Sequence, residues 1–154
     1  MNFLFSQKIV PVILLILLVL VALITGCATQ LPKDSEIRHI PRDRLFDTKL
    51  YQASKEREIP VKITRDKGFF GHLAVIMLKI DGKNITTFHP SEGITIFLSE
   101  GGYVVELINT VCHERAECTT THDVVIKSGI NNNFRIHTNI DDGLTFRRMR
   151  TSNL

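Results

Sequence analysis

Hydrophobic and polar residues are distributed in two different ways along this chain. Residues 9–24 are 16 consecutive apolar residues, preceded by a short start whose only charge is Lys8. Such a run is slightly short for a membrane-spanning helix of about 20 residues and lies near the upper end for a signal-peptide core. From residue 59 onward the apolar residues instead occur in short, mostly alternating groups. The chain therefore divides into an N-terminal targeting segment and a folded part.

The folded part has the pattern of a β protein. Apolar residues alternate with polar ones in several segments, and Asp81-Gly82 is a favoured two-residue hairpin turn. We expect five strands at about 59–64, 72–80, 83–88, 94–99 and 103–108, and two or three more at about 121–127, 133–139 and 144–149. Short strands at this spacing predict an all-β fold, a small antiparallel β-sandwich of about seven strands over residues 38–154.

The same pattern predicts which side chains form the core. The nearly continuous apolar run 72–80 favours a central strand covered on both faces. Alternation in the other strands selects one face of each. The predicted core is Val75, Met77, Ile94, Ile96, Val105, Leu107, Ile126, Phe134 and Ile136.

The region before the first strand is less regular. Residues 28–37 are polar, contain Pro32 and have no apolar period, which predicts a flexible tether. Residues 49–58 are rich in helix formers and predict a short helix with Leu50 and Ala53 inward.

The end of the apolar run carries a recognisable motif. The sequence Leu23-Ile24-Thr25-Gly26-Cys27 resembles the lipobox of bacterial lipoproteins. The resemblance implies a signal peptide over residues 1–26, cleavage before Cys27, and a diacylglyceryl thioether on Cys27, so that residues 27–37 would join the lipid to the domain. Ala28 is not the inner-membrane retention signal of that family, which favours the outer membrane, facing the periplasm. The alternative is an uncleaved N-terminal membrane helix with an incidental cysteine.

A second resemblance covers part of the folded region. Ile80-Asp81-Gly82-Lys83, Phe88-His89-Pro90-Ser91-Glu92 and the later Leu98, Gly102, Tyr103 and Val105 resemble PEGA-type modules. The run Thr64–Phe69 also looks like a segment of small uncharacterised bacterial lipoproteins. The PEGA resemblance implies a small β-sandwich of a bacterial envelope protein and no catalytic residue.

Length and charge narrow the choice of function. A chain of 154 residues is too short for an α/β barrel of about 250 residues. The formal net charge of +3 is too small to argue for nucleic acid. We therefore expect no nucleic-acid partner.

Two of the three cysteines remain if Cys27 is acylated. Cys112 and Cys118 then have one possible pairing, and a disulfide is plausible in an oxidising compartment. Free thiols are one alternative. A metal site that uses His113 and His122 with both cysteines is another, although the spacing is not that of a zinc ribbon or finger.

The remaining candidate chemistry is sparse. The six histidines show no metalloprotease spacing, and no Gly-x-Ser-x-Gly motif is present. Asp141-Asp142 precedes Gly143, as in an ordinary turn. The candidate partner-binding residues form two groups. One is a C-terminal basic cluster, which is suited to bind phosphates or carboxylates and which could instead serve as a charged edge strand. The other is a pair of adjacent aromatics between glycines. The residues of the two groups are Arg147, Arg148, Arg150, Phe69 and Phe70.

These observations predict a lipid-anchored cell-envelope protein that acts as a non-catalytic binding or structural module. Its expected partners are membrane lipid, through Cys27, and an envelope protein or cell-wall polymer; no cofactor and no metal are expected. The alternatives are a metal-handling or enzymatic periplasmic protein that uses the histidines, and an immunity or inhibitor lipoprotein.

Overall fold

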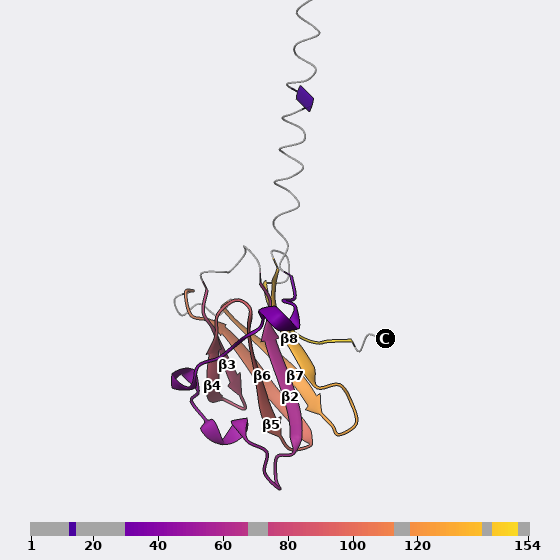
Figure 1. Ribbon diagram of the computed structural model, residues 1–154. Helices are drawn as coiled ribbons and strands as arrows, with labels where there is room; N and C mark the ends of the chain where they lie inside the picture. Colours follow the sequence, from indigo (N-terminus) through magenta and orange to yellow (C-terminus); the bar gives the residue numbers. More distant parts are fainter. Residues whose placement is uncertain (1–12, 15–29, 68–73, 113–117, 140–142, 151–154) are drawn as a thin grey trace, which may run out of the picture.

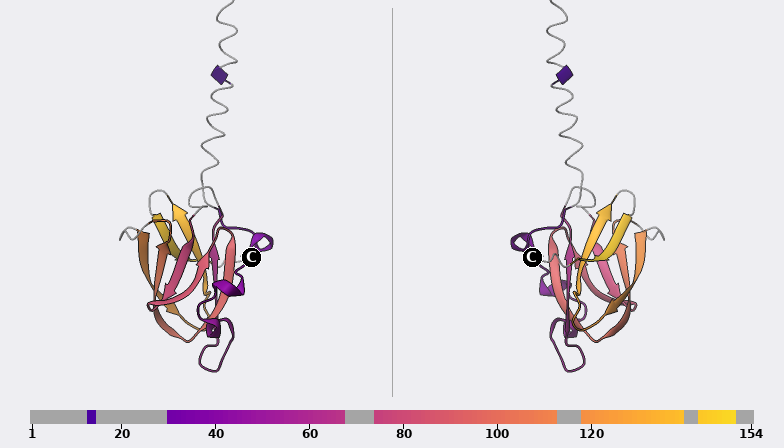
Figure 2. Two further views of the ribbon diagram at one scale, coloured as in Figure 1. Left: turned by 90° about the vertical axis from the view of Figure 1, so that its left-hand side faces the viewer. Right: turned by 90° about the vertical axis from the view of Figure 1, so that its right-hand side faces the viewer.

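The computed structural model describes residues 13–14, 30–67, 74–112, 118–139 and 143–150 (Figure 1). Two sheets face each other, and residues 30–58 run down one side of them (Figure 2). The five-stranded sheet has the order β1 (Arg38–His39), β5 (Glu92–Leu98), β2 (Ile59–Arg65), β8 (Asn133–Asn139) and β9 (Gly143–Arg148). The four-stranded sheet has the order β4 (Lys83–Phe88), β3 (Ile76–Ile80), β6 (Gly101–Asn109) and β7 (Thr119–Ile126).

The predicted all-β sandwich is confirmed. The described residues form nine strands, of which β1 has only two residues, against the seven or so expected. The pairing is mostly antiparallel, but β2 runs parallel to β8 and β1 parallel to β5. Asp81 and Gly82 form the predicted turn between β3 and β4, both with positive φ (49° and 75°), a region that Asp tolerates and Gly favours. In the described part of the chain, no helix is long and apolar enough to span a membrane.

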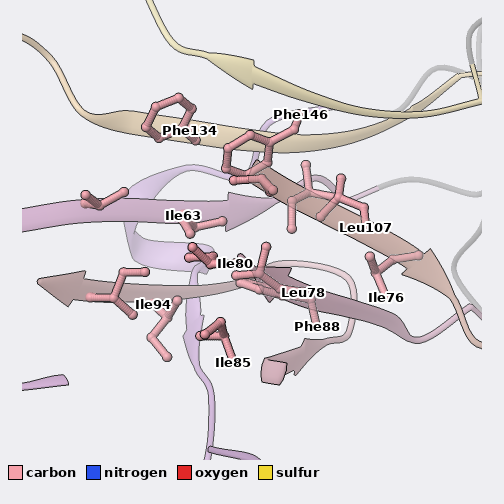
Figure 3. Close-up of a cluster of buried hydrophobic side chains, with 14 of the residues drawn as sticks. Ile63, Ile76, Leu78, Ile80, Ile85, Phe88, Ile94, Leu107, Phe134 and Phe146 are labelled. Atoms are coloured by element: carbon pink, nitrogen blue, oxygen red, sulfur yellow. The ribbon is translucent and has the colours of Figure 1, made fainter. Parts of the chain in front are cut away.

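The core lies between the two sheets. Figure 3 shows side chains from both of them, such as Ile63 and Leu107, pointing into one interior. Seven of the nine predicted core residues are buried there: Ile94, Ile96, Val105, Leu107, Ile126, Phe134 and Ile136.

The prediction for β3 was wrong. Val75 and Met77 are only half-buried, whereas Ala74, Ile76 and Leu78 point into the core. One face of β3 contacts the other sheet and the opposite face is partly open, so the strand alternates instead of being covered on both faces. A continuous apolar run hides this alternation because either face is apolar enough to be buried.

The predicted helix over residues 49–58 was also wrong. Only a 3₁₀ turn forms, η3 (Thr48–Tyr51), where the Asp47 carboxylate accepts a hydrogen bond from the amide of Lys49 at 3.1 Å. Leu50 packs against the core, but Ala53 is exposed. Tertiary contacts outweigh helix propensity here, since the preceding chain covers the edge of β4: the amide of Phe46 donates to the carbonyl of Ile85 at 3.0 Å.

Residues 30–37, predicted as part of a flexible tether, are hydrogen-bonded to the domain. The amide of Gln30 donates to the carbonyl of Lys67 at 2.7 Å, and the amide of Lys67 donates back at 2.8 Å. Pro32 is buried, and η1 (Asp34–Glu36) leads into β1. A second 3₁₀ turn, η2 (Arg42–Arg44), follows. The sequence did not indicate this docking because it depends on backbone pairing with a strand end far along the chain.

The predicted disulfide is present. Cys112 and Cys118 are bonded, with their Cα atoms 5.7 Å apart. β6 and β7 pair antiparallel up to Ile108 and Thr119, so the two cysteines meet where that hairpin opens. Disulfide sulfurs are not thiolate ligands, which removes the metal site built on both cysteines.

We expect the double substitution Cys112→Ser/Cys118→Ser to lower the free energy of unfolding by about 2 kcal/mol, because the short loop between them gains freedom in the unfolded chain. Urea unfolding of wild type and variant under non-reducing conditions measures this difference. Two alkylatable thiols in the folded, unreduced wild type would contradict the bond.

Candidate functional site

A groove lies on the outer face of the five-stranded sheet. Alternation along β8 sends Phe134 and Ile136 into the core and leaves Arg135 and His137 facing outward. Arg147 on β9 pairs directly with Arg135. The groove has a volume of about 370 Å³ and is lined by Leu31, Arg135, His137, Arg147, Arg148, Met149 and Arg150. We call it the basic groove.

A buried carboxylate organises the basic groove. Asp66 follows β2 directly, and its side chain is 3% exposed. Its two oxygens accept hydrogen bonds from Nε of Arg135 at 2.8 Å and from Nη2 at 2.5 Å. Nδ1 of His137 lies 2.8 Å from the same carboxylate. Asp66 therefore fixes the orientation of both outward-facing side chains of β8.

This arrangement leaves one edge of Arg135 directed away from Asp66. The carboxylate occupies the Nε and Nη2 edge, and the side chain is 32% exposed. A guanidinium has a second edge, formed by Nη1 and Nη2, that can donate two parallel hydrogen bonds to an oxyanion. Arg135 is therefore oriented to hold a carboxylate or phosphate in the groove.

The three predicted arginines all line the basic groove, but in different roles. Arg148 donates to the carbonyls of Asn131 and Val125 and, at 2.9 Å, to Oδ1 of Asn132. Its guanidinium also lies over the Phe134 ring, 4.7 Å from the centroid. Arg148 is therefore held as a wall of the groove, whereas Arg147 and Arg150 are exposed.

The groove carries a clear excess of positive charge. Four arginines surround it, and one carboxylate, Asp66, contacts Arg135 and His137 in its floor. Because the groove is open to solvent on one side, its charge attracts anions over roughly one Debye length, about 8 Å at physiological salt.

A second polar cluster lies deeper and serves the fold. Glu92 is almost fully buried and accepts hydrogen bonds from Nη1 and Nη2 of Arg44 at 2.8 and 2.6 Å, and from the amide of His89 at 2.7 Å. Burial alone would raise the pKa of Glu92, but these hydrogen bonds bring it below its usual value. Arg65, 3% exposed, donates to the carbonyls of Ala74 and Phe88.

Burial also changes the titration of Arg65. It lowers the pKa of this side chain to about 10, and the nearby carboxylate of Glu92 counters the shift. The guanidinium therefore stays charged at neutral pH, and it links the end of β2 to neighbouring backbone carbonyls.

The histidines are not brought together where they are described. His137 contacts Asp66, whereas His122 lies near Phe146 with the ring centroids 6.2 Å apart, and burial lowers the pKa of His122. Within the described ranges, no group of three His, Cys, Asp or Glu side chains is placed to hold a metal ion. His72 and His113 lie outside these ranges.

Several other predicted residues also lie outside the described part of the chain. They are Cys27, Phe69, Phe70 and the pair Asp141-Asp142. Their assigned roles stay predictions.

Sequence reasoning missed Asp66 and Arg135, and it considered His137 only among the six histidines, as a possible metal ligand beside His122. The signal for Arg135 and His137 was the alternation of apolar and polar residues along β8. For Asp66 no local signal exists, because it meets Arg135 only through the parallel pairing of β2 with β8.

No family model, curated protein or solved structure matches this chain.

Proposed function

We propose that this protein is a lipid-anchored cell-envelope protein that acts as a non-catalytic binding module. Its basic groove would hold an anionic group, a phosphate or a carboxylate, of an envelope component. The observation that carries this proposal is the buried Asp66, which orients Arg135 and His137 at the floor of a groove lined by four arginines.

The groove is better suited to binding than to catalysis. Asp66 is buried beneath Arg135 and His137, so His137 is the one side chain of the described groove lining that could act as a general acid or base, and no hydroxyl, thiol or carboxylate of that lining lies beside it as a nucleophile. The arginines donate hydrogen bonds but do not exchange protons at neutral pH. A lining dominated by arginines therefore favours holding an oxyanion.

The anchor is supported by the sequence. The lipobox-like run ending at Cys27 follows an apolar stretch of signal-peptide character. An acylated cysteine places the domain at a membrane surface, where phosphates and carboxylates of envelope polymers are the common anions. A cationic groove fits that environment.

We expect neutralising two arginines of the groove to weaken anion binding at least tenfold. The probe is polyphosphate, titrated into the full-length protein in uncharged detergent. The variant is Arg147→Gln/Arg150→Gln, which keeps the side chains long but removes two charges. Its affinity should also depend less on salt, because fewer charges are screened.

The matched control is Lys83→Gln/Lys127→Gln. It removes the same charge from two exposed lysines that do not line the groove. Polyphosphate affinity should change little in this variant. Equal losses in the two variants would show binding by net charge alone and would contradict a groove-specific site.

A further inference from the structure

We propose that the anion held by the basic groove is the phosphate of a lipid headgroup, in the same membrane that carries the anchor. This inference rests on the proposed function, and specifically on acylation at Cys27. It narrows the ligand from any envelope anion to one source.

The first argument is that residues 30–37 are part of the domain. Besides the Gln30–Lys67 pairing, Nζ of Lys67 contacts the Glu36 carboxylate at 2.7 Å, and Nζ of Lys62 contacts Asp34 at 3.0 Å. Ile37 packs so closely over Gly93 that a Cβ atom there would come within 2.7 Å of its side chain. The segment is held along its length and does not act as a spacer.

Second, the acylated Cys27 can extend only a short distance from the domain. Three residue steps separate Cys27 from Gln30, which span about 10 Å at full extension of ~3.3–3.6 Å per residue. A free tether from Cys27 to Ile37 would instead allow up to about 33–36 Å over ten steps. The docked segment thus limits the acylated cysteine to about 10 Å from Gln30.

The third argument is the position of the groove. Leu31, the residue after Gln30, lines the groove together with Arg135 and His137. In Figure 1 the indigo segment that begins at residue 30 lies beside β8. The groove is therefore on the anchored side of the domain, within a few residues of the lipidated cysteine, where headgroup phosphates are the most concentrated anions.

The lining also fits a headgroup. The arginines match phosphate oxygens, and the apolar side chains of Leu31 and Met149 lie at the same groove. A phospholipid presents a phosphate and an apolar glycerol-ester region side by side.

The test uses the mature, lipidated protein, which begins at Cys27, in lipid discs with spin-labelled headgroups. One set of discs contains anionic phosphatidylglycerol, and the other an uncharged galactolipid without phosphate. We expect NMR amide signals of Arg135 and Arg147 to relax several-fold faster than those of Lys83 and Lys127 in the phospholipid discs. This excess should be lost in the galactolipid discs.

Variants separate binding from folding. Arg147→Gln/Arg150→Gln should lose the excess relaxation, whereas Arg147→Lys/Arg150→Lys, which keeps the charges, should retain most of it. Dispersed amide spectra of both variants verify that they fold. Loss in both variants would contradict charge recognition by the groove.

The outcome is distinguishable from failure of the proposed function. Groove-specific binding of polyphosphate without faster relaxation near the phospholipid headgroups would overturn this inference and leave the proposed function standing. Absence of both would overturn both. Equal relaxation in the two kinds of disc would show proximity without phosphate recognition and would also overturn the inference.

Discussion

Replacing Glu92 with alanine is expected to lower the free energy of unfolding by about 3–5 kcal/mol. The carboxylate is 7% exposed and accepts two hydrogen bonds from Arg44 and one from the amide of His89. Its removal leaves Arg44 and the buried Arg65 without their common counter-charge. Breaking one side of a buried ion pair costs far more than the pair contributes, because a charge stays buried and uncompensated.

Urea unfolding monitored by circular dichroism measures this effect. The matched control is Glu36→Ala, which removes an acidic partner from the exposed Lys67–Glu36 pair. That variant should lose much less stability, since exposed ion pairs are weak. Similar losses in Glu92→Ala and Glu36→Ala would show that the buried ion pair of Glu92 contributes no more to the free energy of unfolding than an exposed pair does.

The pH dependence of Glu92 has a definite sign. Because the folded state lowers the pKa of Glu92 below its usual 4.5, its stabilising effect is complete above that pH and is lost as the pH falls through the lowered value. We therefore expect the stability gap between wild type and Glu92→Gln to narrow on acidification below about 4.5. A gap that widens there would contradict the lowered pKa.

The second large effect concerns two neighbours on β3. Leu78 is fully buried between the sheets, whereas Met77 points to the partly open outer face. We expect Leu78→Ala to cost about 2–5 kcal/mol, through lost burial and the cavity left behind. Met77→Ala removes a side chain of similar size and should cost less than half as much.

Equilibrium unfolding of both variants decides which face of β3 is inside. An equal cost would favour the sequence-based interpretation, in which the apolar run is covered on both faces. A larger cost for Met77→Ala would place the strand in the opposite register, in which every side chain changes face.

Much of the fold could be predicted because alternation and turn chemistry are local. Ile94, Ile96 and Leu98 could be assigned to one face of β5 since they occupy alternate positions of a short strand, and Asp81-Gly82 predicted a hairpin. The face of β3 could not be predicted, because its run is apolar on both sides. The helix over residues 49–58 was wrong because packing against β4 and the core overrides propensity.

The site was harder to predict than the fold. Arg147, Arg148 and Arg150 stand out as a cluster in the sequence, and all three line the groove. Their different roles depend on the end of β7 and the loop before β8, which hold the Arg148 guanidinium. Asp66 lies 69 residues from Arg135 along the chain, and only the parallel β2–β8 pairing brings them together.

The central claim is that a lipid on Cys27 holds this domain at a membrane. The most direct measurement is the intact mass of the protein extracted from membranes, with Cys27→Ser as the comparison. We predict a wild-type chain that begins at Cys27 and carries acyl chains, and a variant that keeps residues 1–26 and has no lipid. A wild-type chain that begins at Met1 with an unmodified Cys27, or a Cys27→Ser chain cleaved and acylated like wild type, would contradict the account.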